Sequence, residues 1–128
     1  MIQSYRDLLV WQKAMDLVVA CYGATEQFPK TEIYGLTGQL RRAAVSIPSN
    51  IAEGRGRQHL PEFIHFLHIA QGSLAELETQ IQIANRLNYI EAQQCQTLLQ
   101  QTNEIAQMLH GLIRSLKNRK TLPPDAHP

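Results

Sequence analysis

The sequence is poor in the residues that mark several specialised classes of protein. It has two cysteines, one tryptophan and only 6% aromatic residues. Cys21 and Cys95 lie far apart, without a C-x-x-C pair or a neighbouring histidine, which indicates reduced thiols in or near a core rather than a disulfide or a metal site. Seven glycines and six prolines in 128 residues exclude collagen-like and low-complexity chains.

Long apolar runs and an excess of charge are missing as well. No stretch approaches the roughly 18 apolar residues that a membrane span needs. The apolar pieces of the first 23 residues are interrupted by Gln12, Lys13 and Asp16, unlike the core of a signal peptide. We therefore expect a cytoplasmic protein that has no membrane partner. The net charge of +1 creates no overall field for a polyanion, and 44% hydrophobic residues are enough for one domain with a real core.

Apolar residues recur with a period of about 3.6 almost everywhere, which predicts an all-α fold. Pro29 ends a first helix, Gly54 to Gly56 end a second, and Pro61 suits the first turn of a third. We expect an antiparallel up-and-down four-helix bundle over residues 1–120 and a disordered tail over 121–128. The expected helices span about residues 7–28, 33–54, 61–88 and 91–118.

The third and fourth expected helices each carry one apolar heptad seam, as antiparallel helices of a bundle with short loops do. The seam of the third is Phe63, Leu67, Ala70, Leu74, Leu77, Ile81 and Ala84, and that of the fourth is Cys95, Leu98, Thr102, Ile105, Leu109, Leu112 and Leu116.

The first two expected helices are apolar on more than one side. The first has one line through Val10, Ala14, Leu17, Cys21 and Phe28, and a second line through Leu8, Trp11, Met15, Val18 and Tyr22. A single bundle of this size cannot cover both sides of such helices, so the pattern predicts self-association. The residues expected in the contact between subunits are Trp11, Val45, Pro48 and Ala52.

Pro48 lies inside the second expected helix and is predicted to kink it. A proline in a helix interior removes a backbone hydrogen bond and clashes with the carbonyl four residues earlier, at a cost of about 3 kcal/mol. Ser46, Ser49 and Asn50 are the candidates to bond the carbonyl that Pro48 frees.

Charge is segmented along the chain although its total is small. Residues 41–59 carry four arginines and one glutamate, residues 60–109 one arginine and five glutamates, and residues 110–120 four basic residues and no acid. The basic segments are candidates for phosphate contact, against two alternatives: ion pairs at a subunit interface and a solvated helix end. The candidate nucleic-acid-binding residues are Arg41, Arg42, Arg55, Arg57, Arg114, Lys117, Arg119 and Lys120.

No motif predicts an enzyme, a cofactor or a metal. Glu62, His65 and His68 contain one Glu-x-x-His unit, but a di-iron bundle needs two such units and further inward glutamates, so we interpret these histidines as solvated or interface residues. Gly54 to Arg57 lack the strand and the further glycine or lysine of a nucleotide loop. Arg55, Arg57 and His59 near the start of the third helix remain a modest alternative site for phosphate. We expect no small-molecule substrate.

Residues 5–90 resemble a bacterial family of four-helix-bundle proteins encoded in intervening sequences of the 23S ribosomal RNA gene. The resemblance is carried by Asp7-Leu8-x-Val10-Trp11-Gln12-Lys13-Ala14, by the continuous run from Gln39 to Gly54, and by residues 62–78. It implies a four-helix bundle that assembles as a homopentamer. The family is similar to the accessory proteins of diversity-generating retroelements, which bind nucleic acid. This chain has His59, His65 and His68 where the family often has more basic residues.

These observations favour a non-enzymatic homo-oligomer that binds RNA or DNA weakly and with little dependence on sequence. The alternative is an oligomeric protein-interaction scaffold with no role in nucleic-acid binding. The two differ in whether the basic segments 41–57 and 114–120 meet on one outer surface.

Overall fold

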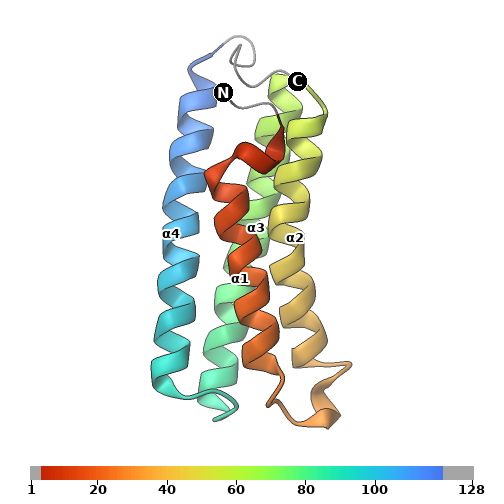
Figure 1. Cartoon of the computed structure of the whole chain (residues 1–128), viewed down its shortest axis with the longest axis vertical. Coiled ribbons are helices and arrows are strands. Elements are labelled where there is room, and N and C mark those ends of the chain that lie inside the picture. The colour runs from red at the N-terminus through yellow and green to blue at the C-terminus, as the bar shows by residue number, and fades with distance from the viewer. Residues whose placement is uncertain (1–3, 120–128) are drawn as a thin grey trace.

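The computed structural model describes residues 4–119, which form an all-α, antiparallel four-helix bundle (Figure 1). This confirms the predicted fold class. The helices are α1 (Leu9–Thr25), α2 (Leu36–Gly56), α3 (Leu60–Arg86) and α4 (Ala92–Lys117), and two short 3-10 helices, η1 (Tyr5–Asp7) and η2 (Lys30–Glu32), precede α1 and α2. The predicted tail at 121–128 lies outside the described residues.

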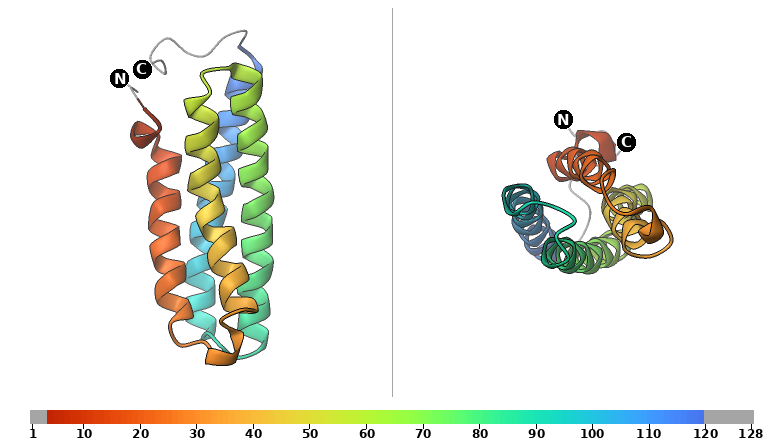
Figure 2. Two further views of the ribbon diagram at one scale, coloured as in Figure 1. Left: turned by 90° about the vertical axis from the view of Figure 1, so that its right-hand side faces the viewer. Right: turned by 90° about the horizontal axis from the view of Figure 1, so that it is seen from below.

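The four helices stand side by side, and each one contacts two neighbours (Figure 2). α1 contacts α2 and α4, and α3 contacts the same two helices, so α1 and α3 occupy opposite corners. At one end of the bundle, here called the terminal end, α1 and α3 begin and α2 and α4 finish. At the other end, the loop end, the α1–α2 and α3–α4 connections reverse the chain.

The predicted heptad seams face the core. All seven residues of the α3 seam are buried, and so are six of the seven on α4, with only Leu112 partly buried. The first predicted line of the first helix is also buried, from Val10 on α1 to Phe28 just after it. The apolar periodicity alone therefore locates the core.

α2 and α3 approach each other closely at Gly54. A Cβ atom at Gly54 would lie 2.6 Å from Cβ of Phe66 and 3.3 Å from Cδ1 of Phe63, so no larger residue fits without a shift of α3. α2 ends at Gly56, within the Gly54 to Gly56 stretch predicted to end the second helix and two residues beyond the expected bound of about 54. Gly54 serves packing, and the chain turns instead at Gln58, whose φ is 56°.

The start and end of α1 also differ from the prediction of a helix over about 7–28. Residues Tyr5–Asp7 form a 3-10 turn with a capping box between Ser4 and Asp7, and the extended Leu8 separates this turn from α1. At the other end α1 finishes at Thr25, whose Oγ1 donates to the carbonyl oxygen of Cys21 at 2.9 Å. Pro29 thus follows α1 by several residues rather than ending it.

α2 runs through Pro48 as one helix, with a polar network beside the proline. Asn50 Nδ2 donates to the carbonyl oxygen of Ser46 at 2.7 Å and to Ser46 Oγ at 2.9 Å, and Ser46 Oγ lies 2.8 Å from Ser73 Oγ on α3. The carbonyl that Asn50 bonds is therefore that of Ser46, whereas the one freed by Pro48 belongs to Ala44. The kink stays a prediction.

Glu32 ties the two connections of the loop end together. Its Oε1 accepts from the backbone N–H of Leu36 at 3.1 Å, and its Oε2 accepts from the Tyr89 hydroxyl at 2.8 Å. These two bonds, the one from Leu36 first, lower the pKa of Glu32, and the bond to the carboxylate raises the pKa of Tyr89. Glu32 thereby caps the start of α2 and holds it against the α3–α4 connection.

Candidate functional site

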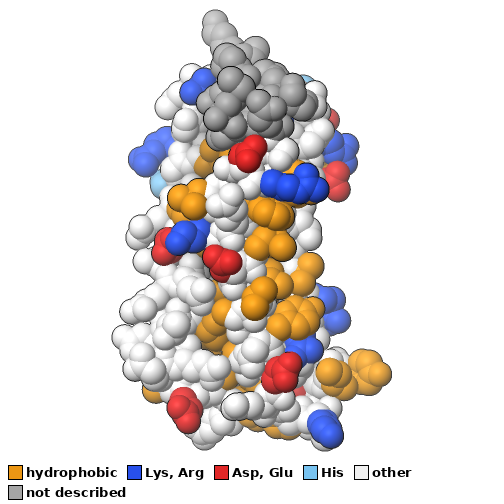
Figure 3. Space-filling view, in the orientation of Figure 1, with side chains coloured by type: hydrophobic (Ala, Val, Ile, Leu, Met, Phe, Trp, Pro, Cys, Tyr) orange, Lys and Arg blue, Asp and Glu red, His pale blue; other side chains and the backbone are white. Residues whose placement is uncertain are grey.

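An apolar seam runs along the outer face of α1 and α2, and Figure 3 shows apolar side chains gathered on this face. We define the apolar seam by Met15, Val19 and Tyr22 on α1 and Val45 on α2. Val19 is 71% exposed, and the other three are about 40% exposed. These residues include members of the second apolar line predicted for α1, which the single chain leaves partly uncovered.

The four residues predicted at a subunit interface differ in what they offer to another molecule. Val45 is exposed, and Ala52 is half-buried. Trp11 is half-buried because Tyr5 packs edge-on against it, with 5.2 Å between the ring centroids. Pro48 is buried within the chain itself. No second chain is present to show the interface.

A groove of about 550 Å³ at the loop-end half of the apolar seam contains Arg41 and Arg42 among its lining residues. The side chain of Arg41 is fixed by two contacts within the chain. Its Nε donates to Thr25 Oγ1 at 2.8 Å, and its guanidinium lies 4.5 Å from the centroid of the Tyr22 ring. Arg42 is exposed and lies along Gly38, where an added Cβ would be 3.3 Å from its Nη1. Within residues 4–119 Arg42 makes no ion pair.

Arg55 is a basic candidate with almost no surface. Its side chain is only 3% exposed, and its Nε and Nη2 atoms are buried without a hydrogen-bond partner. The loss of water around the guanidinium lowers the pKa of Arg55. A phosphate has no access to these atoms in the chain as folded, which the sequence did not indicate because arginines in a last helical turn are ordinarily solvated.

Arg57 is exposed but already paired with acidic groups. Its Nε lies 3.4 Å from Oε2 of Glu53, and its Nη1 lies 3.7 Å from Oε2 of Glu62. Its guanidinium also sits 5.3 Å from the centroid of the Phe66 ring. Arg57 therefore links the end of α2 to the start of α3, and its charge is largely balanced there.

The last turn of α4 and the residues directly after it carry exposed cations that are free of ion pairs among the described residues. Arg114, Lys117 and Arg119 are exposed, and none of them takes part in an ion pair among the described residues. We call these three residues the α4 basic cluster. Lys120, the fourth predicted member, lies outside the described residues. Arg6 on η1 is a further exposed cation at the same end of the bundle, which the sequence reading did not single out.

The predicted basic residues thus fall into two groups along the bundle. Arg57 and the α4 basic cluster share the terminal end, because α2 and α4 both finish there. Arg41 and Arg42 lie in the second turn of α2, near the loop end. At a rise of about 1.5 Å per residue, roughly 22 Å of helix separates Arg42 from Arg57. Of the segment 41–57, only the end at Arg57 therefore shares the terminal end with residues 114–119.

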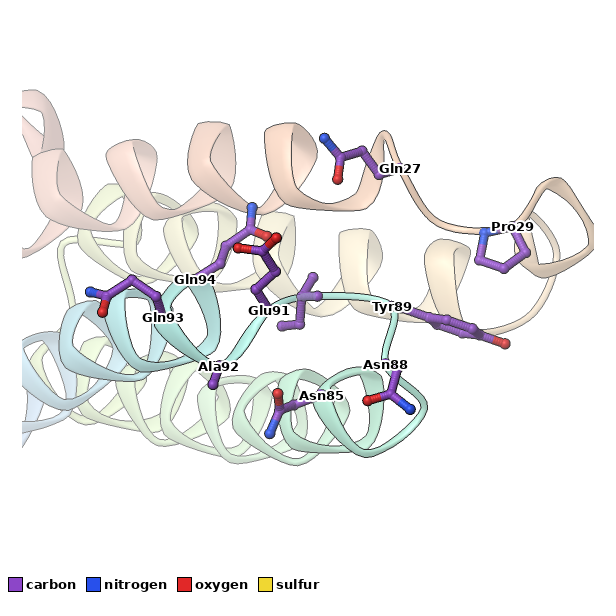
Figure 4. A pocket seen from close by; sticks show the side chains of 10 residues that line it. Gln27, Pro29, Asn85, Asn88, Tyr89, Glu91, Ala92, Gln93 and Gln94 are labelled. Carbon is purple, nitrogen blue, oxygen red and sulfur yellow. The ribbon is translucent and has the colours of Figure 1, made fainter.

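A large cleft of about 870 Å³ opens at the loop end between the two connections (Figure 4). Half of its ten lining residues bear side-chain amides, the others include Tyr89 and Glu91, and none of them is basic. The amide-bearing residues are Gln27, Asn85, Asn88, Gln93 and Gln94. This cleft offers hydrogen bonds but no positive charge, so it lies apart from the cationic groups.

The histidines on α3 are placed as predicted, on its outer side. His65 and His68 are exposed, and His68 Nδ1 lies 3.0 Å from Oε1 of Gln71 on the same helix. Among residues 4–119, no three of the side chains His, Cys, Asp and Glu come together in a group suited to a metal ion. Over the same range, every helix is too short or too polar to cross a bilayer.

Comparison with known proteins places this chain in a family. The chain is similar to the crystal structure of a protein of unknown function from the S23 ribosomal protein family of Bacteroides thetaiotaomicron. The two share 24% identity and a TM-score of 0.76 over 83% of this chain and 96% of that one. No curated protein matches the chain. The family model described as 23S rRNA-intervening sequence protein matches residues 6–111, and the chain therefore belongs to the 23S rRNA-intervening sequence protein family.

Proposed function

We propose that this protein is a non-enzymatic, cytoplasmic homo-oligomer that binds RNA or DNA weakly and with little dependence on sequence. The observation that carries the proposal is the α4 basic cluster, in which three neighbouring cations are exposed and unpaired within the described chain. When unpaired cations on a protein surface bind a phosphate backbone, they release counterions from it. The resulting contribution to the binding free energy does not depend on base sequence.

One copy of the α4 basic cluster is a poor nucleic-acid site. Each phosphate contact contributes little at physiological salt, and the negative pole of the α4 dipole already stabilises these cations without any ligand. Repetition changes this balance, because a strand that spans several subunits gains avidity from contacts that are individually weak. Binding should therefore depend on the length of the strand and on assembly of the protein.

The apolar seam supports the assembly that this proposal needs. Val19, Met15, Tyr22 and Val45 expose apolar surface on adjacent helices, and such contiguous surface is typical of a contact between proteins. Burying the seam between copies would remove it from water and repeat the α4 basic cluster around an axis. We propose a homopentamer, the number five being the one that the family resemblance implies.

Stacking on bases contributes little in this proposal. Trp11 is half-buried against Tyr5, Arg41 lies over the Tyr22 ring, and Tyr34, although 95% exposed, lies in the α1–α2 connection at the loop end, away from the α4 basic cluster. Proteins that bind single strands without base preference usually combine a basic groove with such faces. We therefore expect similar affinities for single-stranded and double-stranded nucleic acid.

The test is a fluorescence-anisotropy titration of the full chain with short and long RNA and DNA at about 50 and 200 mM salt. We expect long strands to bind much more tightly than short ones and the affinity to fall steeply with salt. The variant Arg114→Gln/Lys117→Gln should flatten the salt dependence. The control Lys30→Gln/Arg86→Gln removes the same charge at the loop end and should leave the slope nearly unchanged.

Absence of binding at the lower salt by the assembled protein would contradict the nucleic-acid part of this proposal. The apolar seam would then favour the second candidate, an oligomeric protein-interaction scaffold. Equal effects of the two double variants would instead show that only total charge matters, and that the α4 basic cluster is no site.

A further inference from the structure

Two neighbouring segments of α3 and α4 carry no acidic side chain. Residues 63–75 of α3 and residues 105–119, from α4 to just beyond its end, contain no aspartate and no glutamate. α3 begins and α4 finishes at the terminal end, and the two helices are in contact, so the segments lie side by side in the terminal half of the bundle (Figure 2). An anion that approaches this half of the α3–α4 face therefore meets no opposing charge from either segment.

A histidine from each helix lies on this face. Phe66 marks the side of α3 that faces α2, because it packs against Gly54. His68 follows Phe66 by two residues, a rotation of about 200°, and is therefore on the side away from α2. On α4, Glu104 marks the side that faces α1, where it pairs with a lysine. His110, six residues later, is rotated by about 240° and lies on the opposite flank of the buried heptad seam, which is the flank beside α3.

The two histidines also lie at the same level of the bundle. Counted from the terminal end at about 1.5 Å per residue, His68 is about 12 Å along α3 and His110 about 10 Å along α4. His65 lies one turn closer to the terminal end on α3, and Lys117 follows His110 by two turns on the same flank of α4. All three histidines are exposed, and we call them the histidine patch. The histidine patch therefore continues the α4 basic cluster along the bundle.

The acidic residues nearest to the histidine patch face other helices. Glu62, one turn before the patch on α3, contacts Arg57 of α2 at 3.7 Å. Glu104 pairs with Lys13 of α1 at 3.2 Å. Glu78 follows the patch on α3 at a distance of about 15 Å along the helix. Among the described residues of α3 and α4, the charged groups that share a face with the patch are therefore the cations of the α4 basic cluster.

Gln71 fixes the hydrogen-bonding state of His68. Oε1 of Gln71 can only accept, so Nδ1 of His68 donates to it at 3.0 Å. In the neutral ring Nε2 then carries a lone pair and no hydrogen, and it offers nothing to a phosphate oxygen. Protonation adds an N–H group at Nε2 together with a positive charge. Because histidine is the side chain that changes charge between about pH 5 and 8, a modest fall in pH turns an acceptor on this face into a charged donor.

We propose that the histidine patch extends the nucleic-acid contact of the α4 basic cluster along the α3–α4 face, and that protonation of the patch strengthens the contact with the phosphate backbone. This inference rests on the proposed function and adds a surface and a pH dependence to it. Each protonated histidine provides one more cation that releases a counterion on binding, so affinity rises as pH falls.

Assembly through the apolar seam leaves the histidine patch open. The seam lies on α1 and α2, and the α3–α4 face is on the opposite side of the bundle. Contacts through two opposite faces extend a straight row of copies, whereas a ring closes through faces that are inclined to each other. A ring that buries the seam therefore keeps the α3–α4 face of every copy accessible to a long strand.

The test is a fluorescence-anisotropy titration of the full chain with a long DNA duplex at about pH 8 and pH 6, each at about 50 and 200 mM salt. We expect the wild-type affinity to be about tenfold higher at the lower pH, with a steeper salt dependence. The variant His65→Gln/His68→Gln/His110→Gln should lose most of this gain and keep the wild-type affinity at the higher pH. His59→Gln is the matched control, because His59 lies against Glu62, outside the patch, and should keep the gain.

A fixed charge provides the opposite test. His68→Lys/His110→Lys should bind at the higher pH nearly as tightly as the wild-type protein does at the lower pH, and its affinity should depend much less on pH. Exposed carboxylates keep their charge over this range, so they do not contribute to the difference. Circular dichroism and light scattering verify that every variant keeps its helices and its mass at both pH values.

The outcomes separate this inference from the proposed function. Absence of binding at both pH values overturns the two together. Binding that is no tighter at the lower pH, a gain that the triple variant retains, or an equal loss of the gain in His59→Gln overturns the role of the histidine patch while the proposed function stands. A gain that the triple variant loses and the two lysines reproduce establishes it.

Discussion

Two nitrogen atoms of the Arg55 guanidinium are shielded from water and bond to nothing in the folded chain. A charged group in this state loses its hydration and gains no compensating partner, so its ionised form is destabilised. One residue away, Gly54 is packed under Phe63 and Phe66, which leaves the turn of helix that carries Arg55 little freedom to move outward. The residue thus weakens the fold of the single chain.

Replacing Arg55 by methionine, which is similar in length and uncharged, should therefore stabilise the isolated chain. We expect Arg55→Met to raise the free energy of unfolding by about 1–3 kcal/mol, measured by urea unfolding under conditions where the protein is monomeric. Arg57→Met is the matched control, because Arg57 is exposed and its ion pairs contribute little. A loss of more than 1 kcal/mol in Arg55→Met would show that the guanidinium has a stabilising partner.

Cys21 gives the fold a dependence on alkaline pH. Burial raises the pKa of the Cys21 thiol from 9.0 to about 12, so between these values the folded chain keeps a proton that the unfolded chain releases. Because the folded state binds more protons there, stability falls as pH rises, by up to about 1.4 kcal/mol per unit. Cys21→Ala should lower stability at pH 8 but flatten its decline from pH 9 to 11 in urea unfolding. An unchanged slope would contradict the raised pKa.

At the scale of helices, the close packing of α2 on α3 depends on one missing side chain. An alanine at position 54 would bring its Cβ to 2.6 Å from Cβ of Phe66, which is attached directly to the α3 backbone and cannot turn away. Position 56 lies on the same helix with open space around it. The two glycines therefore offer a matched comparison of packing and helix propensity.

We expect Gly54→Ala to destabilise the chain by about 1–3 kcal/mol through overpacking. Gly56→Ala should be neutral or stabilising by up to about 1 kcal/mol, since alanine is the better helix former and meets no neighbour. Thermal unfolding of both variants, followed by circular dichroism, measures the difference. Equal effects at the two positions would mean that α2 and α3 are not packed this closely.

The sequence predicts the helices and the core well, because both follow from apolar spacing within one element. The sequence predicts the end of α2 at Gly54 because glycine commonly ends helices. In the structure a glycine is needed there because Phe66 of α3 leaves no room for a side chain. The sequence also misses the 3-10 turn before α1, where Leu8 is extended and buried in the core. Single-chain periodicity carries no information on such contacts between elements.

On the scale of the whole molecule, the topology sorts the basic residues in a way that sequence order does not reveal. Arg41 and Arg57 belong to one basic segment, yet they lie toward opposite ends of the bundle. Arg57 and Arg114 are far apart in sequence but share the terminal end. Burial of Arg55 and pairing of Arg57 leave the α4 basic cluster as the main free cations at this end. Which basic residues stay exposed and unpaired can be predicted only when the packing of all four helices is known.

The apolar seam yields a prediction about assembly. Val45 is 40% exposed at the centre of the seam, and Ile83 on α3 is 42% exposed away from it, so the two side chains form a pair matched in size and accessibility. A glutamate buried between subunits without a partner would cost several kcal/mol, whereas a glutamate on a solvated surface costs little. Val45→Glu should therefore reduce the assembled protein to smaller species at micromolar concentration or make it aggregate, while Ile83→Glu keeps the wild-type mass.

Multi-angle light scattering after gel filtration measures these masses, and circular dichroism verifies that both variants keep their helices. The comparison separates a contact at the seam from a general effect of added negative charge, because both variants change the net charge equally. If Val45→Glu kept the wild-type mass, the contact between subunits would have to lie outside the apolar seam. If both variants dissociated, the contact between subunits would also include the outer face of α3, which carries the exposed Ile69.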